Sequence, residues 1–152
     1  MRRVLLTGMS GTGKSSVVQA LAARGYKAVD TDEGWSEPLP GGRQQWRQDA
    51  IQELLATEDA DVLFLAGCEE NQVHFHDQFD CIILLSAPAE VLVQRLAIRT
   101  TNAYGRAPEE LRRILHDLET IEPRLRRVAD HEVDTTIPID DVVTAILRLA
   151  CA

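Results

Sequence analysis

The sequence predicts a three-layer α/β domain with a mostly parallel sheet, and two observations lead to this fold class. Short apolar runs alternate with helix-like segments about five times along the 152 residues. The runs at 62–66 and 81–85 are apolar at consecutive positions, as in strands that are covered on both faces. The length suits one domain, and we expect residues 1–152 to form it.

Each expected element follows from a local pattern of apolar spacing and turn residues. Strands are predicted at 4–7, 27–30, 62–66, 81–85 and 131–134. Helices are predicted at 14–24, 43–57, 88–99, 109–129 (broken at Pro123) and 139–149. Polar loops fill 31–42 and 100–108. Because such sheets bind ligands beyond the carboxyl ends of their strands, we expect the chemistry in the loops that follow strands.

The charge and cysteine usage disfavour several classes of partner. A formal net charge of −8 makes nucleic acid and anionic membranes poor partners. No apolar run approaches the length of a membrane span. The three scattered cysteines form no disulfide framework and favour a reducing cytoplasm. Nothing in the sequence indicates an obligate protein partner.

The stretch GMSGTGKS, at 8–15, matches the phosphate-binding pattern G-x-x-x-x-G-K-[ST] between a strand and a helix. Glycines let successive N–H groups point at phosphate oxygens, and the helix N-terminus adds its positive dipole end. Lys14 supplies a positive charge near the β- and γ-phosphates, and Ser15 offers a hydroxyl to Mg²⁺. The predicted nucleotide-binding residues are Gly8, Ser10, Gly11, Thr12, Gly13, Lys14, Ser15 and Ser16.

Two aspartates follow the second strand in the stretch VDTD. Asp30 ends the strand and Asp32 lies two residues on, so extended backbone would send both side chains the same way. One carboxylate would hold Mg²⁺, and the other would orient or deprotonate an attacking hydroxyl. An Asx turn at Asp30 is the alternative without catalytic meaning.

GMSGTGKS, VDTD and a late R-x-x-x-D-x-x-V-D-T pattern together resemble the shikimate kinase and nucleoside monophosphate kinase group of P-loop kinases. The resemblance runs over nearly the whole chain. It implies a P-loop NTPase fold with a five-stranded parallel sheet, a lid, and transfer of the γ-phosphoryl group of ATP. It also implies that Asp30 lies near Mg²⁺ and that Asp32 binds acceptor hydroxyls.

The resemblance assigns further residues and has two departures. It places Thr135 at the adenine base and Arg124 at the acceptor or nucleotide. The glycine triplet that binds the acceptor aligns with 66–68, where only Gly67 is a glycine. The lid motif R-P-L-L is missing from the loop at 100–108.

Arginines are the candidate cations for the transferred phosphoryl group. Arg95 and Arg99 are four residues apart on one helix face. Closing the short lid at 100–108 would bring Arg99 or Arg106 over the phosphates and exclude water. Ordinary solvated arginines are the alternative, because the chain uses arginine for nearly all its positive charge.

The acceptor region is predicted at about 31–57. Arg43 and Arg47 would begin the helix at 43–57 and clamp an anionic acceptor near Trp35 and Trp46. The alternative is that both arginines are solvated and that Trp46 lies in the core.

Two further stretches have weaker signals. The loop GCEEN, at 67–71, would contact the acceptor or Mg²⁺ through Glu69, Glu70 or Asn71, or be a plain polar loop. His74 and His76 would share one side of a strand, but no third ligand lies at zinc-site spacing, so we predict no structural zinc.

These observations predict an ATP-dependent kinase that uses Mg²⁺ and a small-molecule acceptor, with a hydroxyl favoured. The alternatives are a nucleoside monophosphate kinase, a P-loop NTPase acting as a switch, and a kinase that binds nucleotide without chemistry. The runs at 62–66 and 81–85 end without an aspartate, which argues against an efficient ATPase.

Overall fold

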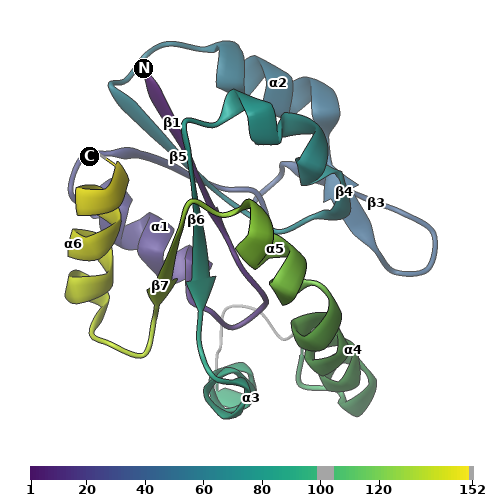
Figure 1. Ribbon diagram of the computed structural model, residues 1–152. Helices are drawn as coiled ribbons and strands as arrows, with labels where there is room; N and C mark the ends of the chain where they lie inside the picture. Colours follow the sequence, from purple (N-terminus) through teal and green to yellow (C-terminus); the bar gives the residue numbers. More distant parts are fainter. Residues whose placement is uncertain (99–104, 151–152) are drawn as a thin grey trace.

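The computed structural model describes residues 1–98 and 105–150 and places helices on both faces of a central sheet (Figure 1). In chain order the elements are β1 (Arg2–Thr7), α1 (Lys14–Ala23), β2 (Lys27–Asp30), β3 (Ser36–Pro38), β4 (Gln44–Trp46), α2 (Gln48–Ala56), β5 (Val62–Ala66), the 3-10 helix η1 (Glu70–Gln78), β6 (Cys81–Ser86), α3 (Ala89–Ile98), α4 (Pro108–Thr120), α5 (Glu122–Val128), β7 (His131–Asp134) and α6 (Ile139–Ala150). None of the described helices is both long enough and apolar enough to cross a membrane.

The main sheet has the order β2–β5–β1–β6–β7, and every neighbouring pair is parallel. The chain builds the sheet to one side of β1 through β2 and β5, and then to the other side through β6 and β7. The loop after β1 therefore lies where the strand order reverses, the usual ligand-binding position of an open α/β sheet. The predicted α/β class with a five-stranded parallel sheet is confirmed.

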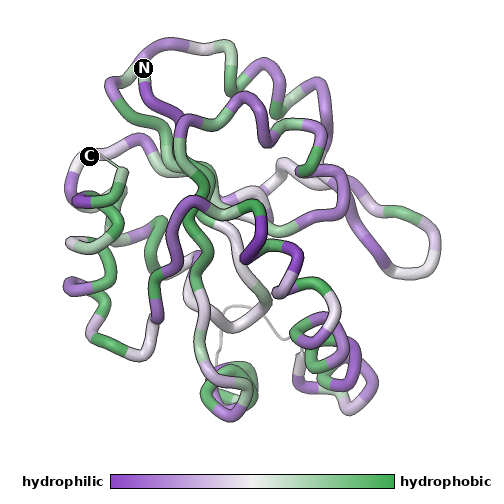
Figure 2. Tube along the Cα trace, viewed as in Figure 1, coloured by the Kyte–Doolittle hydropathy of each residue, from purple (hydrophilic) through white to green (hydrophobic). Residues whose placement is uncertain are grey.

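The core lies on both faces of this sheet, as the uniformly apolar strands predict. Along β1, Val4 and Leu6 pack with the helices α1 and α6, whereas Leu5 packs on the opposite face with α2. Figure 2 shows the central strands as hydrophobic along most of their length. Burial on both faces leaves the strand ends and their loops as the places where polar chemistry is accessible.

The helix predicted at 43–57 is wrong over its first five residues. Residues Gln44–Trp46 form β4, which pairs antiparallel with β3 in a hairpin, and α2 begins only at Gln48. The Asn71 side chain accepts a hydrogen bond from the backbone N–H of Trp46 and donates one to its carbonyl, both at 2.9 Å. A helix would use these backbone groups internally, so the bonds to Asn71 hold Trp46 extended.

The helical segment predicted at 109–129 with a break at Pro123 is the pair α4 and α5; the break falls at Ile121, and Pro123 lies in the first turn of α5. One other prediction needs correction. His74 and His76 lie on η1 and not on a strand. Of the predicted lid at 100–108, residues 100–104 lie outside the described residues, as does Arg99.

Candidate active site

The loop between β1 and α1 has a conformation that requires glycine at two positions. A Cβ atom on Gly8 would lie 2.3 Å from the carbonyl oxygen of Leu85 in β6, so a side chain there would push the loop off the sheet. Gly13, which caps α1, has a φ of 98°, in the left-handed region. These two glycines let the chain curl tightly from the centre of the sheet into the N-terminus of α1.

The Lys14 side chain lies within this curl. Its ammonium donates to the carbonyl oxygens of Gly8 at 2.5 Å and Met9 at 3.0 Å, and the Thr12 hydroxyl donates to Met9 at 2.8 Å. The ammonium charge adds to the positive dipole end of α1. Ser10, Gly11 and Ser16 belong to the same loop and first helical turn. The arrangement can bind the phosphates of a nucleotide.

Ser15 and Asp30 come together at the ends of α1 and β2. The Ser15 hydroxyl donates to Asp30 Oδ2 at 2.6 Å, and Asp30 Oδ1 accepts the backbone N–H of Asp32 at 3.0 Å. The second bond is the Asx turn that was the alternative interpretation of VDTD, so this turn and the pairing with Ser15 coexist. A hydroxyl beside a carboxylate is a set of hard oxygen ligands that fits Mg²⁺.

Glu69 is a further carboxylate of the site. It precedes η1 at the end of β5 and is partly buried. Its pKa is raised to about 7, first by burial and then by the negative charge of Asp32, while Lys14 acts in the opposite direction. The sequence singles Glu69 out only as one of three polar candidates in a loop. The spacing of Glu69 and Gln72, which resembles a helix capping box after a strand, is the signal that marks its fixed position.

Arg95, on α3, forms hydrogen bonds with two loops of the predicted nucleotide-binding site. Its guanidinium donates to the carbonyl oxygen of Gly11 at 3.2 Å, and to the hydroxyl and carbonyl oxygens of Thr135 at 2.9 and 2.6 Å. Thr135 is buried, and its hydroxyl also donates to the Ser86 carbonyl at 3.3 Å. Arg95 on α3 thus joins the phosphate loop to the loop that follows β7.

The other predicted arginines are spread over several elements. Arg43 precedes β4 and forms an ion pair with Glu70. Arg47 caps α2 and donates to the carbonyl oxygen of Gly34 at 3.0 Å, so the two do not share a helix face as predicted. Arg124 on α5 and Arg106 before α4 are both exposed.

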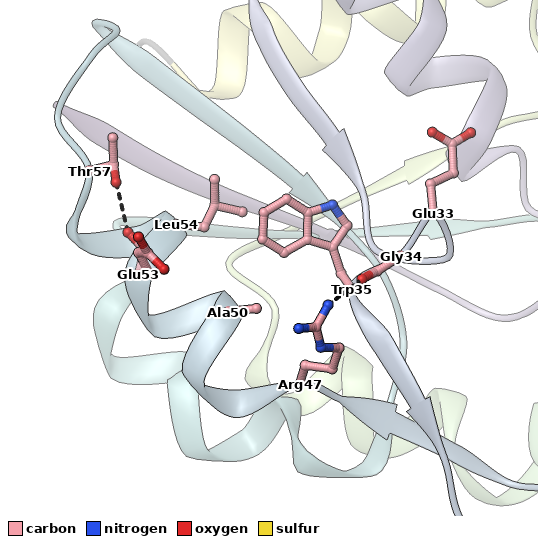
Figure 3. Close-up of a pocket in the computed structure, with 8 residues that line it drawn as sticks. All are labelled: Glu33, Gly34, Trp35, Arg47, Ala50, Glu53, Leu54 and Thr57. Carbon is pink, nitrogen blue, oxygen red and sulfur yellow. Dashed lines mark hydrogen bonds between the residues drawn. The ribbon is translucent and has the colours of Figure 1, made fainter.

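A cavity of about 560 Å³ lies between the loop after β2 and α2 (Figure 3). It is lined by Glu33, Gly34, Trp35, Arg47, Ala50, Glu53, Leu54 and Thr57. Figure 3 shows the Trp35 indole over Leu54, with the Arg47 guanidinium turned toward Gly34. The lining contains no residue of the phosphate loop, so this cavity is separate from the group around Lys14.

Comparison with known proteins supports the fold. A family model described as an AAA domain matches residues 4–116. No significant match appears among curated proteins. The chain is similar to shikimate kinase from Acinetobacter baumannii in complex with shikimate, with a TM-score of 0.71 and 20% identity over 98% of this chain and 92% of that one.

Two further solved structures are similar. One is shikimate kinase from Bacteroides thetaiotaomicron, with a TM-score of 0.70 and 20% identity over 99% of both chains. The other is a gluconokinase from Sinorhizobium meliloti 1021, with a TM-score of 0.67 and 23% identity over 98% of this chain and 93% of that one. At these identities the likeness establishes a shared P-loop fold.

Proposed function

The chain belongs to the AAA domain family, and from this premise we propose that it is an ATP-dependent kinase that phosphorylates a hydroxyl group of a small molecule. The observation that carries the proposal is the junction of the phosphate loop with the loop after β2. Ser15 bonds Asp30, and Asp30 in turn holds the backbone of Asp32. Asp30 therefore contacts both the Ser15 hydroxyl and the start of the loop that carries Asp32, which supports a role for this second carboxylate beside the nucleotide.

Each group then has a chemical task. Lys14 and the N–H groups at the start of α1 hold the phosphates, while Ser15 and Asp30 hold Mg²⁺. Bound Mg²⁺ neutralises charge on the phosphate oxygens. Asp32 orients the acceptor hydroxyl and accepts its proton. The hydroxyl oxygen bonds to the γ-phosphorus as the bond from that phosphorus to ADP breaks.

The proposal extends to the surroundings of the reaction. Arg95 and Thr135 position the nucleotide side, and Arg99 and Arg106 supply further charge at the phosphates. Gly67, at the end of β5, contacts the acceptor. We also propose a cytoplasmic location, because Cys68 and Cys81 are free thiols.

A coupled ADP-release assay tests the kinase proposal. The protein is given MgATP alone, then with polyols, sugars and hydroxy acids, and then with nucleoside monophosphates. We expect a hydroxyl compound to stimulate ADP release several-fold, because a positioned acceptor replaces water as the nucleophile. Equal rates with and without every acceptor would contradict the proposal, and stimulation only by nucleoside monophosphates would select the alternative acceptor class.

Variants of the two lysines test the phosphate site. Lys14→Ala should lower acceptor-stimulated turnover at least about 100-fold, because it removes the charge aimed at the phosphates. Lys27→Ala is the matched control, since Lys27 is the only other lysine and pairs with Asp59 at the opposite end of β2. Comparable losses in both variants would show a general defect and not a loss at the site.

Asp32→Asn tests the acceptor side. The amide keeps the size of the side chain but neither carries charge nor takes up a proton, so turnover should fall about 100-fold. Circular dichroism should show an unchanged fold, because Asp32 is exposed. Full activity in this variant would remove Asp32 from the mechanism.

A further inference from the structure

Glu69 is fixed in place by hydrogen bonds that lead to the end of β1. Its carboxylate accepts the backbone N–H of Gln72, and the Gln72 side chain accepts the backbone N–H of Glu69 at 3.2 Å. Gln72 is buried and also donates to the hydroxyl of Thr7, at 3.2 Å, directly before the phosphate loop. The position of Glu69 is therefore tied to the loop that holds Lys14.

Charged residues lie in the loops around this carboxylate. Asp32 raises the pKa of Glu69 and Lys14 lowers it. The three residues follow β5, β2 and β1, which are neighbours in the sheet. Two carboxylates and one ammonium thus gather at the carboxyl ends of these strands.

Two of the arginines that would bind an anionic acceptor are engaged elsewhere. Arg43 pairs with Glu70, and Arg47 donates to the Gly34 carbonyl beside the separate cavity in Figure 3. Arg124 is exposed on α5. A carboxylate or phosphate on the acceptor would meet the negative charge of Asp32, joined by that of Glu69 above about pH 7, without these partners.

Two uncharged polar groups, on Thr31 and Trp46, lie near the carboxyl ends of β2 and β5. Thr31 and Trp46 are fully buried, and the Thr31 hydroxyl and Trp46 indole N–H have no hydrogen-bond partner within residues 1–98 and 105–150. A Cβ atom on Gly67 would lie 2.2 Å from Thr31 Oγ1 and 3.1 Å from Trp46 Nε1. Both unpartnered groups therefore lie against Gly67, which must be glycine to leave room for them between the loops that carry Asp32 and Glu69.

We propose that Asp32 and Glu69 flank the acceptor and that the acceptor is a polyhydroxyl compound without a negative charge. This inference rests on the proposed kinase function and deepens it. Glu69 binds a hydroxyl or ammonium group of the acceptor, and Asp32 takes the proton of the attacked hydroxyl. The reaction is otherwise the transfer described above, with ADP as leaving group.

An acceptor panel of polyhydroxyl compounds that differ in charge tests the charge selection. Its arms are neutral polyols (ribitol, inositol), amino polyols (glucosamine, streptamine) and carboxylated polyols (gluconate, shikimate), each with MgATP. We expect stimulated ADP release in a neutral or amino arm and none in the carboxylated arm. Stimulation only by carboxylated compounds would overturn the inference and leave the kinase function standing. Stimulation in no arm would contradict both.

The role of Glu69 is tested with a matched pair on one segment. Glu69→Gln should raise the KM of the stimulating acceptor about tenfold and leave the KM of ATP unchanged, because only an acceptor contact is lost. Asp77→Asn makes the same chemical change at an exposed position of η1 and should match the wild type. Equal acceptor KM values in both variants would exclude Glu69 from the acceptor site.

Discussion

At the scale of the residue, Asp30 is the group on which both halves of the site depend. One carboxylate oxygen accepts the hydroxyl of Ser15, and the other accepts the backbone N–H of Asp32. The carboxylate proposed to hold Mg²⁺ therefore also fixes the start of the acceptor loop. Loss of Asp30 would disturb nucleotide and acceptor together, which is why the variants that separate the two sides are at Lys14 and Asp32.

Glu69 predicts a specific dependence of stability on pH. Its pKa is raised from 4.5 to about 7 in the folded protein, first by burial and then by Asp32 and Glu70, with Lys14 opposing. The folded state therefore retains a proton that the unfolded state releases above its own pKa. This contribution to the free energy of unfolding is fully present below about pH 4.5 and is lost as pH rises through about 7.

Urea unfolding of wild type and Glu69→Gln is compared between pH 5 and 8, without nucleotide or Mg²⁺. The difference between their free energies of unfolding at each pH gives the contribution of the Glu69 carboxyl. The variant has no ionisable group at this position, so its stability relative to wild type should increase with pH across this range. The amide can still accept the N–H of Gln72 and preserve the cap. Parallel pH profiles for the two proteins would contradict the assignment.

The residues of the site differ in how far the sequence predicts them. The phosphate loop and Lys14 follow from a contiguous motif, whose local geometry needs little beyond its own glycines. The contact of Ser15 with Asp30 follows once β1 and β2 are known to be parallel. Glu69 was predicted only as a possible contact, because its place beside Lys14 depends on β5 lying next to β1. The bond from Gln72 to Thr7 depends on the same adjacency.

At the scale of the element, we expect Arg95 on α3 to contribute to nucleotide binding. Arg95→Ala removes the bonds to Gly11 and Thr135, which join the phosphate loop to the loop after β7. The affinity for ATP should fall about tenfold, as expected for the loss of charged hydrogen bonds that preorganise a site.

Isothermal titration with a non-hydrolysable ATP analogue measures this loss, with Gln94→Ala as the control. Gln94 is the preceding residue of α3 and is exposed. Its variant should bind the analogue as the wild type does. Wild-type affinity in Arg95→Ala would show that the bonds of Arg95 to the two loops do not contribute to nucleotide binding.

Local sequence pattern predicts some of the secondary-structure elements correctly and misses others. The five strands of the main sheet were predicted because consecutive apolar residues suit a sheet covered on both faces. The hairpin of β3 and β4 was missed, since Trp46 and Ile51 fit the spacing of an amphipathic helix. The deciding contact comes from Asn71, 25 residues away from Trp46, and no local pattern contains it.

At the scale of the whole molecule, the strand order concentrates the chemistry at one edge of the sheet. The central strand β1 leads into the phosphate loop, the loop after its neighbour β5 carries Glu69, and the edge strand β2 ends in Asp30. An acidic chain with a net charge of −8 thus holds Lys14 among negative groups that suit Mg²⁺ and an uncharged or cationic acceptor. The fold class was predictable from the order of elements, whereas the charge balance of the site required the topology.

The fate of the γ-phosphoryl group tests the central claim most directly. Phosphorus NMR of the protein with MgATP and the acceptor that best stimulates ADP release follows every phosphorus-containing product. Transfer to a hydroxyl predicts a phosphomonoester resonance that grows in equal amount with ADP, and Lys14→Ala should abolish both. Inorganic phosphate as the only product beside ADP would show hydrolysis and contradict the kinase account.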